Sequence, residues 1–245
     1  MIEIGIKIGL ILSAVIAFVI PLLMLFYYIF NKKEMLKPFI VGVSVFFISQ
    51  ILLRLPLLTY VLANQNWYMR LSLNPYLYSI FLGLTAGIFE EVGRYIGFKY
   101  FLKNNKKYND GLSFGFGHWG VEAFIIVGIN AVVLLFSPNL IELSNISTIN
   151  AFLMGLERLF VLSVHVGFSM IVLYGIRLNK ISYLFVAIIL HGILDAGVGI
   201  LPQLFNMGAI SMEIYVLIWS LGFLYLIYKF KMKFNKLENK TMMEE

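Results

Sequence analysis

The sequence predicts an all-α membrane protein, a polytopic transmembrane helical bundle of about seven spans. Hydrophobic residues make up 60% of the 245 residues and charged residues only 13%, with a mean hydropathy of +0.88. A soluble domain needs far more charge to cover its surface. Apolar runs also recur along the chain, each close to the roughly 20 helical residues that cross a hydrocarbon core.

Polar breaks separate the apolar runs. Asn74-Pro75 precedes the third run and Ser137-Pro138 follows the fourth, and both are common turn signals. The first run is too long for a signal-peptide core and is followed by no small-residue cleavage site, so we expect a retained helix. One transmembrane domain is predicted over residues 1–235, with a polar cytoplasmic tail over 236–245. The expected spans are residues 5–30, 38–62, 76–101, 111–136, 150–175, 181–200 and 213–230.

Basic residues occur in alternate connections between the runs. They concentrate in residues 31–37 and 103–110, in Arg177 and Lys180, and in the tail, whereas the other connections hold almost none. By the positive-inside rule the N-terminus lies outside and the C-terminus in the cytoplasm. The net charge of +6 is therefore a topology signal, which indicates the lipid bilayer of the plasma membrane and no nucleic-acid partner. No feature of the sequence fixes an oligomeric state.

A charged turn interrupts the third run. Glu90, Glu91 and Arg94 fall within one helical turn at membrane depth. A charge there costs roughly 2.5–3.5 kcal/mol on insertion scales and is retained only when paired, hydrated or used. An i,i+4 ion pair between Glu90 and Arg94 accounts for one glutamate as scaffolding and leaves the second free. We interpret this turn as the acidic part of a buried site.

The three histidines of the chain fall at the same depth. At 1.5 Å per residue, His118, His165 and His191 lie with Glu90 and Glu91 in a layer roughly 10–15 Å below the cytoplasmic surface, on four consecutive spans. A single such histidine most often bonds a neighbouring helix. Three at one depth with two glutamates favour a functional site, which we expect to open toward the cytoplasm.

Carboxylates accompany two of the imidazoles. Glu122 follows His118 by four residues and Asp195 follows His191 by four, so the members of each pair share a helix face. A carboxylate beside an imidazole fixes its tautomer and raises its basicity, which suits proton transfer or metal binding. Three neutral imidazoles and a water also form an open catalytic Zn²⁺ shell. His118, His165 and His191 are therefore a candidate zinc site, and a metal-free site based on glutamate stays open.

The remaining charged and small residues of these spans have structural explanations. Arg54 and the neighbours Glu157 and Arg158 are expected toward the outer side, as snorkelling chains or a mutual salt bridge. Glycines such as Gly83 and Gly87 precede the charged turn, and small residues let helices approach closely.

The polar motifs resemble those of the intramembrane CAAX prenyl-protease and bacteriocin-processing superfamily, and within it most closely the YhfC-type intramembrane metalloproteases. That superfamily is marked by a glutamate pair followed within a turn by arginine, by Phe-x-x-x-His on the next helix and by His-x-x-x-Asn on a later one. Here the arginine comes one residue earlier, and Asp195 stands in place of the asparagine, as an acid does in the PrsW-type proteases. The matching residues are Glu90, Glu91, Arg94, Phe114, His118, His191 and Asp195.

The resemblance implies an intramembrane endopeptidase that cleaves a membrane peptide or protein with an activated water, its catalytic core within about residues 76–200. It implies that Glu90 is the general base, that Glu91 supports it and that Arg94 holds both carboxylates. His118 and His191 would orient the water or stabilise the oxyanion, with His191 oriented by the aspartate that follows it.

Two other classes of function compete with a protease. Buried chains of acids and histidines also form proton relays, so a proton- or cation-coupled transporter is the main alternative. A catalytically silent receptor or immunity protein is the third, and it would not depend on the buried site.

Overall fold

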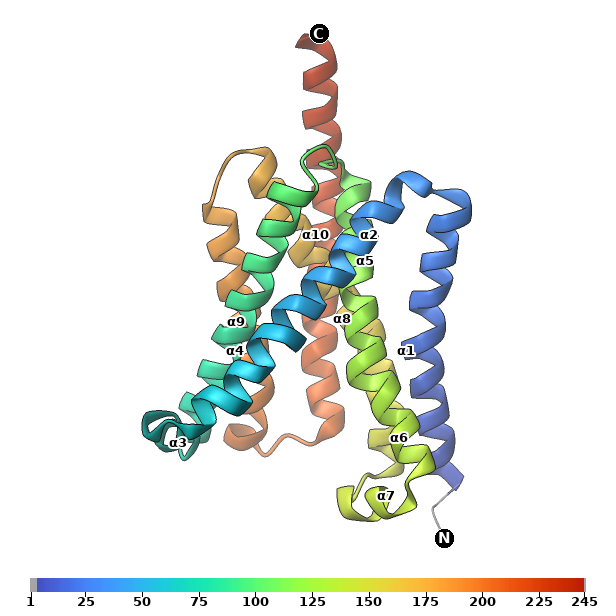
Figure 1. Ribbon diagram of the computed structural model, residues 1–245, viewed down its shortest axis with the longest axis vertical. Helices are drawn as coiled ribbons and strands as arrows, with labels where there is room; N and C mark the ends of the chain where they lie inside the picture. Colours follow the sequence, from blue (N-terminus) through green and yellow to red (C-terminus); the bar gives the residue numbers. More distant parts are fainter. Residues whose placement is uncertain (1–3, 245) are drawn as a thin grey trace.

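The computed structural model describes residues 4–244, which form one bundle of long helices (Figure 1). No β-strand occurs among these residues, so the all-α prediction is confirmed. The helices are α1 (Ile4–Asn31), α2 (Lys33–Phe46), α3 (Asn66–Ser72), α4 (Pro75–Ile96), α5 (Tyr108–Glu122), α6 (Asn130–Phe136), α7 (Pro138–Ser144), α8 (Thr148–Arg177), α9 (Ser182–Phe205) and α10 (Ala209–Glu244).

Three of the long helices continue into π-helical segments. Segment η1 (Phe47–Arg54) extends α2, η4 (Gly97–Phe101) extends α4, and η5 (Ala123–Ile129) joins α5 to α6. The second span is completed by η2 (Leu57–Val61) and the 3₁₀ turn η3 (Leu62–Asn64). Such π-helical turns are rare and frequently occur at functional sites.

The number of membrane spans agrees with the sequence. Six helical stretches of the described chain are long and apolar enough to cross a membrane. A seventh span results if α3 and residues Pro75–Phe101, which meet at a bend of 114°, count as one. The chain is therefore a multi-pass membrane protein, and its termini lie at opposite ends of the bundle, as an odd number of crossings requires (Figure 1). The end that faces the cytoplasm stays a prediction from the lysines.

The two ends of the bundle differ in charge. The lysine-rich end, at the top of Figure 1, carries the connections at residues 32, 102–107 and 178–181. The opposite end carries the bent α3 and the connection around α7. Helix α10 continues beyond the lysine-rich end into the expected tail, of which residue 245 lies outside the described residues.

Helix α4, which carries the charged turn, has a fixed start and a close neighbour. The Asn74 side chain accepts hydrogen bonds from the backbone N–H groups of Tyr76 and Leu77, both at 3.1 Å, and so caps the helix. A Cβ added at Gly83 would lie 2.5 Å from the carbonyl oxygen of Gly192 on α9. Glycine there lets α4 and α9 pack closely, which brings the charged turn against the histidine of α9.

Candidate active site

Glu90 of α4 is the centre of a buried polar cluster. Its Oε2 lies 2.9 Å from Nε2 of His118 and accepts a hydrogen bond from Arg94 at 3.3 Å. Its Oε1 accepts a hydrogen bond of 2.8 Å from the Gln50 amide. Glu90 is only 5% exposed, so these partners compensate a carboxylate that would otherwise be costly at this depth.

Glu91 and Arg94 form the fully buried part of the same cluster, which we call the sealed side. Oε1 of Glu91 accepts a hydrogen bond from Arg94 and lies 2.7 Å from Nδ1 of His191, and Glu91 is fully buried. Arg94 is fully buried as well and pairs with both glutamates. The expected ion pair between Glu90 and Arg94 is therefore present, but the second glutamate is not free, because Arg94 holds it too.

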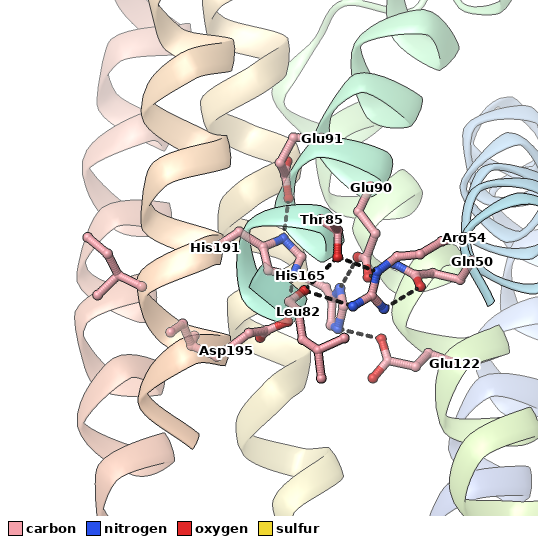
Figure 2. Close-up of polar contacts among 12 residues, drawn as sticks. Gln50, Arg54, Leu82, Thr85, Glu90, Glu91, Glu122, His165, His191 and Asp195 are labelled. Atoms are coloured by element: carbon pink, nitrogen blue, oxygen red, sulfur yellow. Dashed lines mark hydrogen bonds and ion pairs between the residues drawn. The ribbon is translucent and has the colours of Figure 1, made fainter. Parts of the chain in front are cut away.

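His165 of α8 links the cluster to a second group of charges (Figure 2). An arginine can only donate, so Nδ1 of His165 accepts from Arg94 at 2.8 Å and the proton lies on Nε2. This Nε2 donates to Oε2 of Glu122 at 2.7 Å. The other oxygen of Glu122 accepts from Arg158 at 2.6 Å, and Arg158 also bonds Glu157. The expectation that Glu122 would accompany His118 is wrong, since the carboxylate bonds a histidine of another helix.

His191 of α9 and Asp195 form the pair that their spacing predicted. Nε2 of His191 lies 3.6 Å from Oδ2 of Asp195, while its Nδ1 contacts Glu91 (Figure 2). The Phe168 ring stacks on the imidazole at 4.8 Å between centroids. The Asp195 side chain is 36% exposed, so this pair extends from the sealed core to accessible space.

A cavity of about 420 Å³ adjoins the cluster. Apolar side chains, among them Leu82, Val161 and Leu194, form much of its wall. Glu91 and Arg94 are not part of that wall, so a substrate in the cavity would not contact them. The clustered residues that line the cavity are Glu90, Glu122, His165, His191 and Asp195.

The cavity lies between the cluster and the opposite end of the bundle. Its wall includes Ser79 of α4, Glu157 of α8 and Gly199 of α9, all on that side of the cluster. On the lysine-rich side of the cluster lies a group of fully buried apolar side chains, which we call the apolar plug: Phe98, Leu102, Phe114, Met170 and Leu173.

This arrangement contradicts our expectation of a site that opens toward the lysine-rich end, which the basic residues predict to be cytoplasmic. The spacing of the residues along their helices gave a depth from that end. Spacing does not predict where buried apolar side chains close the bundle, because packing depends on side chains from several helices.

Two polar residues of η1 belong to the site, although the sequence did not single out Gln50 and gave Arg54 a structural role. Gln50 donates to Glu90 and accepts a hydrogen bond of 3.1 Å from Arg54. We expected Arg54 to snorkel toward the membrane surface, and this expectation is wrong. Arg54 lines the cavity and donates to Thr85 and to the carbonyl of Leu82 (Figure 2). Their four-residue spacing at the depth of the charged turn was the available signal.

The donor atoms of Glu90, His118 and His165 form a group that could hold a metal ion. One ligand atom from each lies within 4.8 Å of the others, and all three residues are buried. This group differs from the expected three-histidine shell. His191 is not part of it, since Nδ1 of that ring is engaged by Glu91.

Known proteins match most of the chain. A family model described as YhfC intramembrane metalloprotease matches residues 16–146 and 136–219. The uncharacterised membrane protein YhfC of Bacillus subtilis (strain 168) is 30% identical over 207 residues, which cover 75% of this chain and 80% of that protein. No solved structure matches the chain. The matched residues include the whole polar cluster and the cavity wall.

Proposed function

This chain belongs to the YhfC intramembrane metalloprotease family, and we propose that it is an intramembrane endopeptidase that hydrolyses peptide bonds of membrane-embedded or membrane-associated substrates. The observation that carries the proposal is the buried group of Glu90, His118 and His165 at the edge of a cavity that also exposes a carboxylate, Asp195. Hydrolysis in an apolar surrounding needs both an activating group and a proton acceptor that the same water can reach.

The donor group fits a divalent metal such as Zn²⁺. Oε2 of Glu90 lies 2.9 Å from Nε2 of His118 and 4.0 Å from Nδ1 of His165, and two imidazoles with one carboxylate form an open catalytic zinc shell. Glu122 on the far nitrogen of His165 supplies the outer carboxylate that usually orients such a ring. When bound, the metal supplies Lewis-acid activation of water and of the scissile carbonyl.

Arg94 contacts the same donor atoms. Its Nη2 bonds both Oε2 of Glu90 and Nδ1 of His165, so these two contacts must be given up when the residues hold a metal. Its other terminal nitrogen, Nη1, bonds Glu91 and keeps the guanidinium paired on the sealed side of the cluster.

Asp195 is the proton acceptor that the cavity wall favours. Glu122 has both oxygens engaged, by His165 and Arg158, and Glu157 is paired with the same arginine. Asp195 faces only Nε2 of His191, at 3.6 Å, and keeps free acceptor capacity toward the cavity. We assign Asp195 as the acceptor of the proton from the attacking water, and His191 as the residue that orients this carboxylate.

The apolar plug favours a protease over the alternative, a proton- or cation-coupled transporter. A transporter must expose its site to each side of the membrane in turn, so the plug would have to open in a second conformation. Here fully buried side chains such as Phe98 and Phe114, whose rings stack at 4.3 Å, close the lysine-rich side. The cavity gives access from one side, which suffices for a hydrolase.

The proposal is tested with the purified protein in proteoliposomes and a mixture of membrane-spanning peptides, whose fragments are identified by mass spectrometry. We expect cleavage that a chelator abolishes and Zn²⁺ restores. Asp195→Asn should lower the cleavage rate about 10²–10⁴-fold, while Asp195→Glu, which keeps a carboxylate, should retain more activity. Uptake of protons or cations without cleavage would contradict the proposal and indicate the transporter.

A further inference from the structure

Arg54 carries a positive charge at the cavity wall and, among the described residues, forms no direct ion pair with a carboxylate. Its guanidinium contacts the Gln50 amide oxygen, the Thr85 hydroxyl and the Leu82 carbonyl, at 3.1, 3.2 and 2.7 Å. All three partners are neutral, and none of the ion pairs of the described residues includes Arg54. A guanidinium at membrane depth without a direct ion pair is a candidate for a functional role.

The other arginine of the cavity wall, Arg158, is already paired with carboxylates. The two terminal nitrogens of Arg158 bond Glu122 and Glu157, and both ring nitrogens of His165 are engaged. The hydroxyl of Ser79 donates to a backbone carbonyl of its own helix. Ionised carboxylates can only accept. Arg54 has five N–H groups and uses three, which leaves one on each terminal nitrogen.

We propose, on the basis of the proposed function, that Arg54 is a further catalytic residue, which binds the oxyanion that forms on the scissile carbonyl. Gln50 fixes its position, since this amide bridges Arg54 and Glu90 by hydrogen bonds of 3.1 and 2.8 Å. The guanidinium is therefore one side chain away from the Glu90 carboxylate, and both line the same cavity.

The charges of the step match this placement. The water oxygen bonds to the carbonyl carbon while an O–H bond of the water breaks and its proton passes to the Asp195 carboxylate. The π electron pair of the carbonyl moves onto its oxygen. One negative charge thus disappears at Asp195 and one appears on the carbonyl oxygen. A fixed cation with two spare donors that bind the carbonyl oxygen stabilises the oxyanion more than the uncharged carbonyl, and this difference lowers the barrier.

The test compares Arg54→Gln and Arg54→Lys with wild type on a peptide that wild type cleaves. Removal of one oxyanion donor typically costs about 10²–10³-fold in kcat. We expect a loss of this size for Arg54→Gln with KM nearly unchanged, and a smaller loss for Arg54→Lys, which keeps the charge but not the fork. Arg177→Gln removes an arginine that pairs with Glu238 away from the cavity and should leave kcat unchanged.

A binding measurement separates this role from a structural one. The probe is a phosphinic analogue of the cleaved peptide, whose tetrahedral anionic centre resembles the reaction intermediate. Arg54→Gln should bind this analogue about 10²–10³-fold more weakly than wild type and bind the uncleaved peptide equally well. Equal loss for both ligands, or an unchanged kcat, would overturn the inference. Absence of cleavage by wild type would instead refute the proposed function.

Discussion

Glu90 and Glu91 are neighbours in sequence, yet they belong to two different regions of the molecule. Glu90 lies on the cavity side, where it meets His118 and His165 and can be reached from accessible space. Glu91 lies on the sealed side, fully buried between Arg94 and His191. Burial next to a cavity allows a carboxylate to do chemistry, whereas burial without access leaves it to balance charge.

The largest effect is expected from Glu90→Gln. An amide is a poor substitute for the carboxylate in the donor group, so the metal that we propose would be lost, together with several kcal/mol of transition-state stabilisation. We expect cleavage to fall by roughly 10³-fold or more and stoichiometric zinc to disappear from the purified protein, as measured by metal analysis. Glu142→Gln, the same change on the exposed face of α7, is the control and should change neither.

Glu91→Gln should act on stability instead. The substitution leaves the fully buried Arg94 with one carboxylate in place of two, and breaking a buried ion pair costs about 3–5 kcal/mol. We expect a lower free energy of unfolding in detergent but retention of bound zinc by the folded fraction. Loss of the metal from well-folded Glu91→Gln protein would contradict the division between the two sides.

A smaller effect is expected from Glu122→Gln, which tests how the cavity side is built. Glu122 orients His165, and removal of an outer carboxylate of this kind typically costs 10–100-fold in metal affinity. Chelator competition should show that loss. Glu157→Gln is a matched control, because Glu157 pairs with the same arginine but does not touch His165. Equal losses in both variants would assign the effect to Arg158.

The sequence could predict the spans and the layer of the site, because both follow from one-dimensional patterns. Apolar runs have the length of the membrane, and the rise of a helix converts sequence position into depth. The pairing of His191 with Asp195 also follows from spacing within a single helix.

The partners across helices could not be predicted in this way. Glu122 has the correct spacing for His118 but reaches His165, since the rotation of α5 against α8 is set by packing. Gln50 and Arg54 bond each other, as their four-residue spacing allows, but their contacts with α4 depend on how the two helices pack. The side that the cavity occupies depends on which half of the bundle is filled, as the fully buried Phe114 and Leu173 show.

The last prediction tests access to the two sides directly, with single cysteines in a chain that has none of its own. Ser79 lines the cavity, whereas Ser169 is fully buried one turn beyond His165 toward the lysine-rich end. Serine and cysteine are similar in size, so Ser79→Cys and Ser169→Cys form a matched pair. We expect a small membrane-impermeant thiol reagent to modify Ser79→Cys readily and Ser169→Cys hardly at all, as measured by mass spectrometry.

The side from which the reagent acts decides the orientation as well. If the lysine-rich end is cytoplasmic, the cavity faces outward, and Ser79→Cys should react in right-side-out vesicles. Reaction only in inverted vesicles would keep the cavity but reverse the predicted topology. Fast modification of Ser169→Cys from the lysine-rich side would show that the apolar plug opens, which would remove the structural argument against a transporter and the distinction between the sealed side and the cavity side.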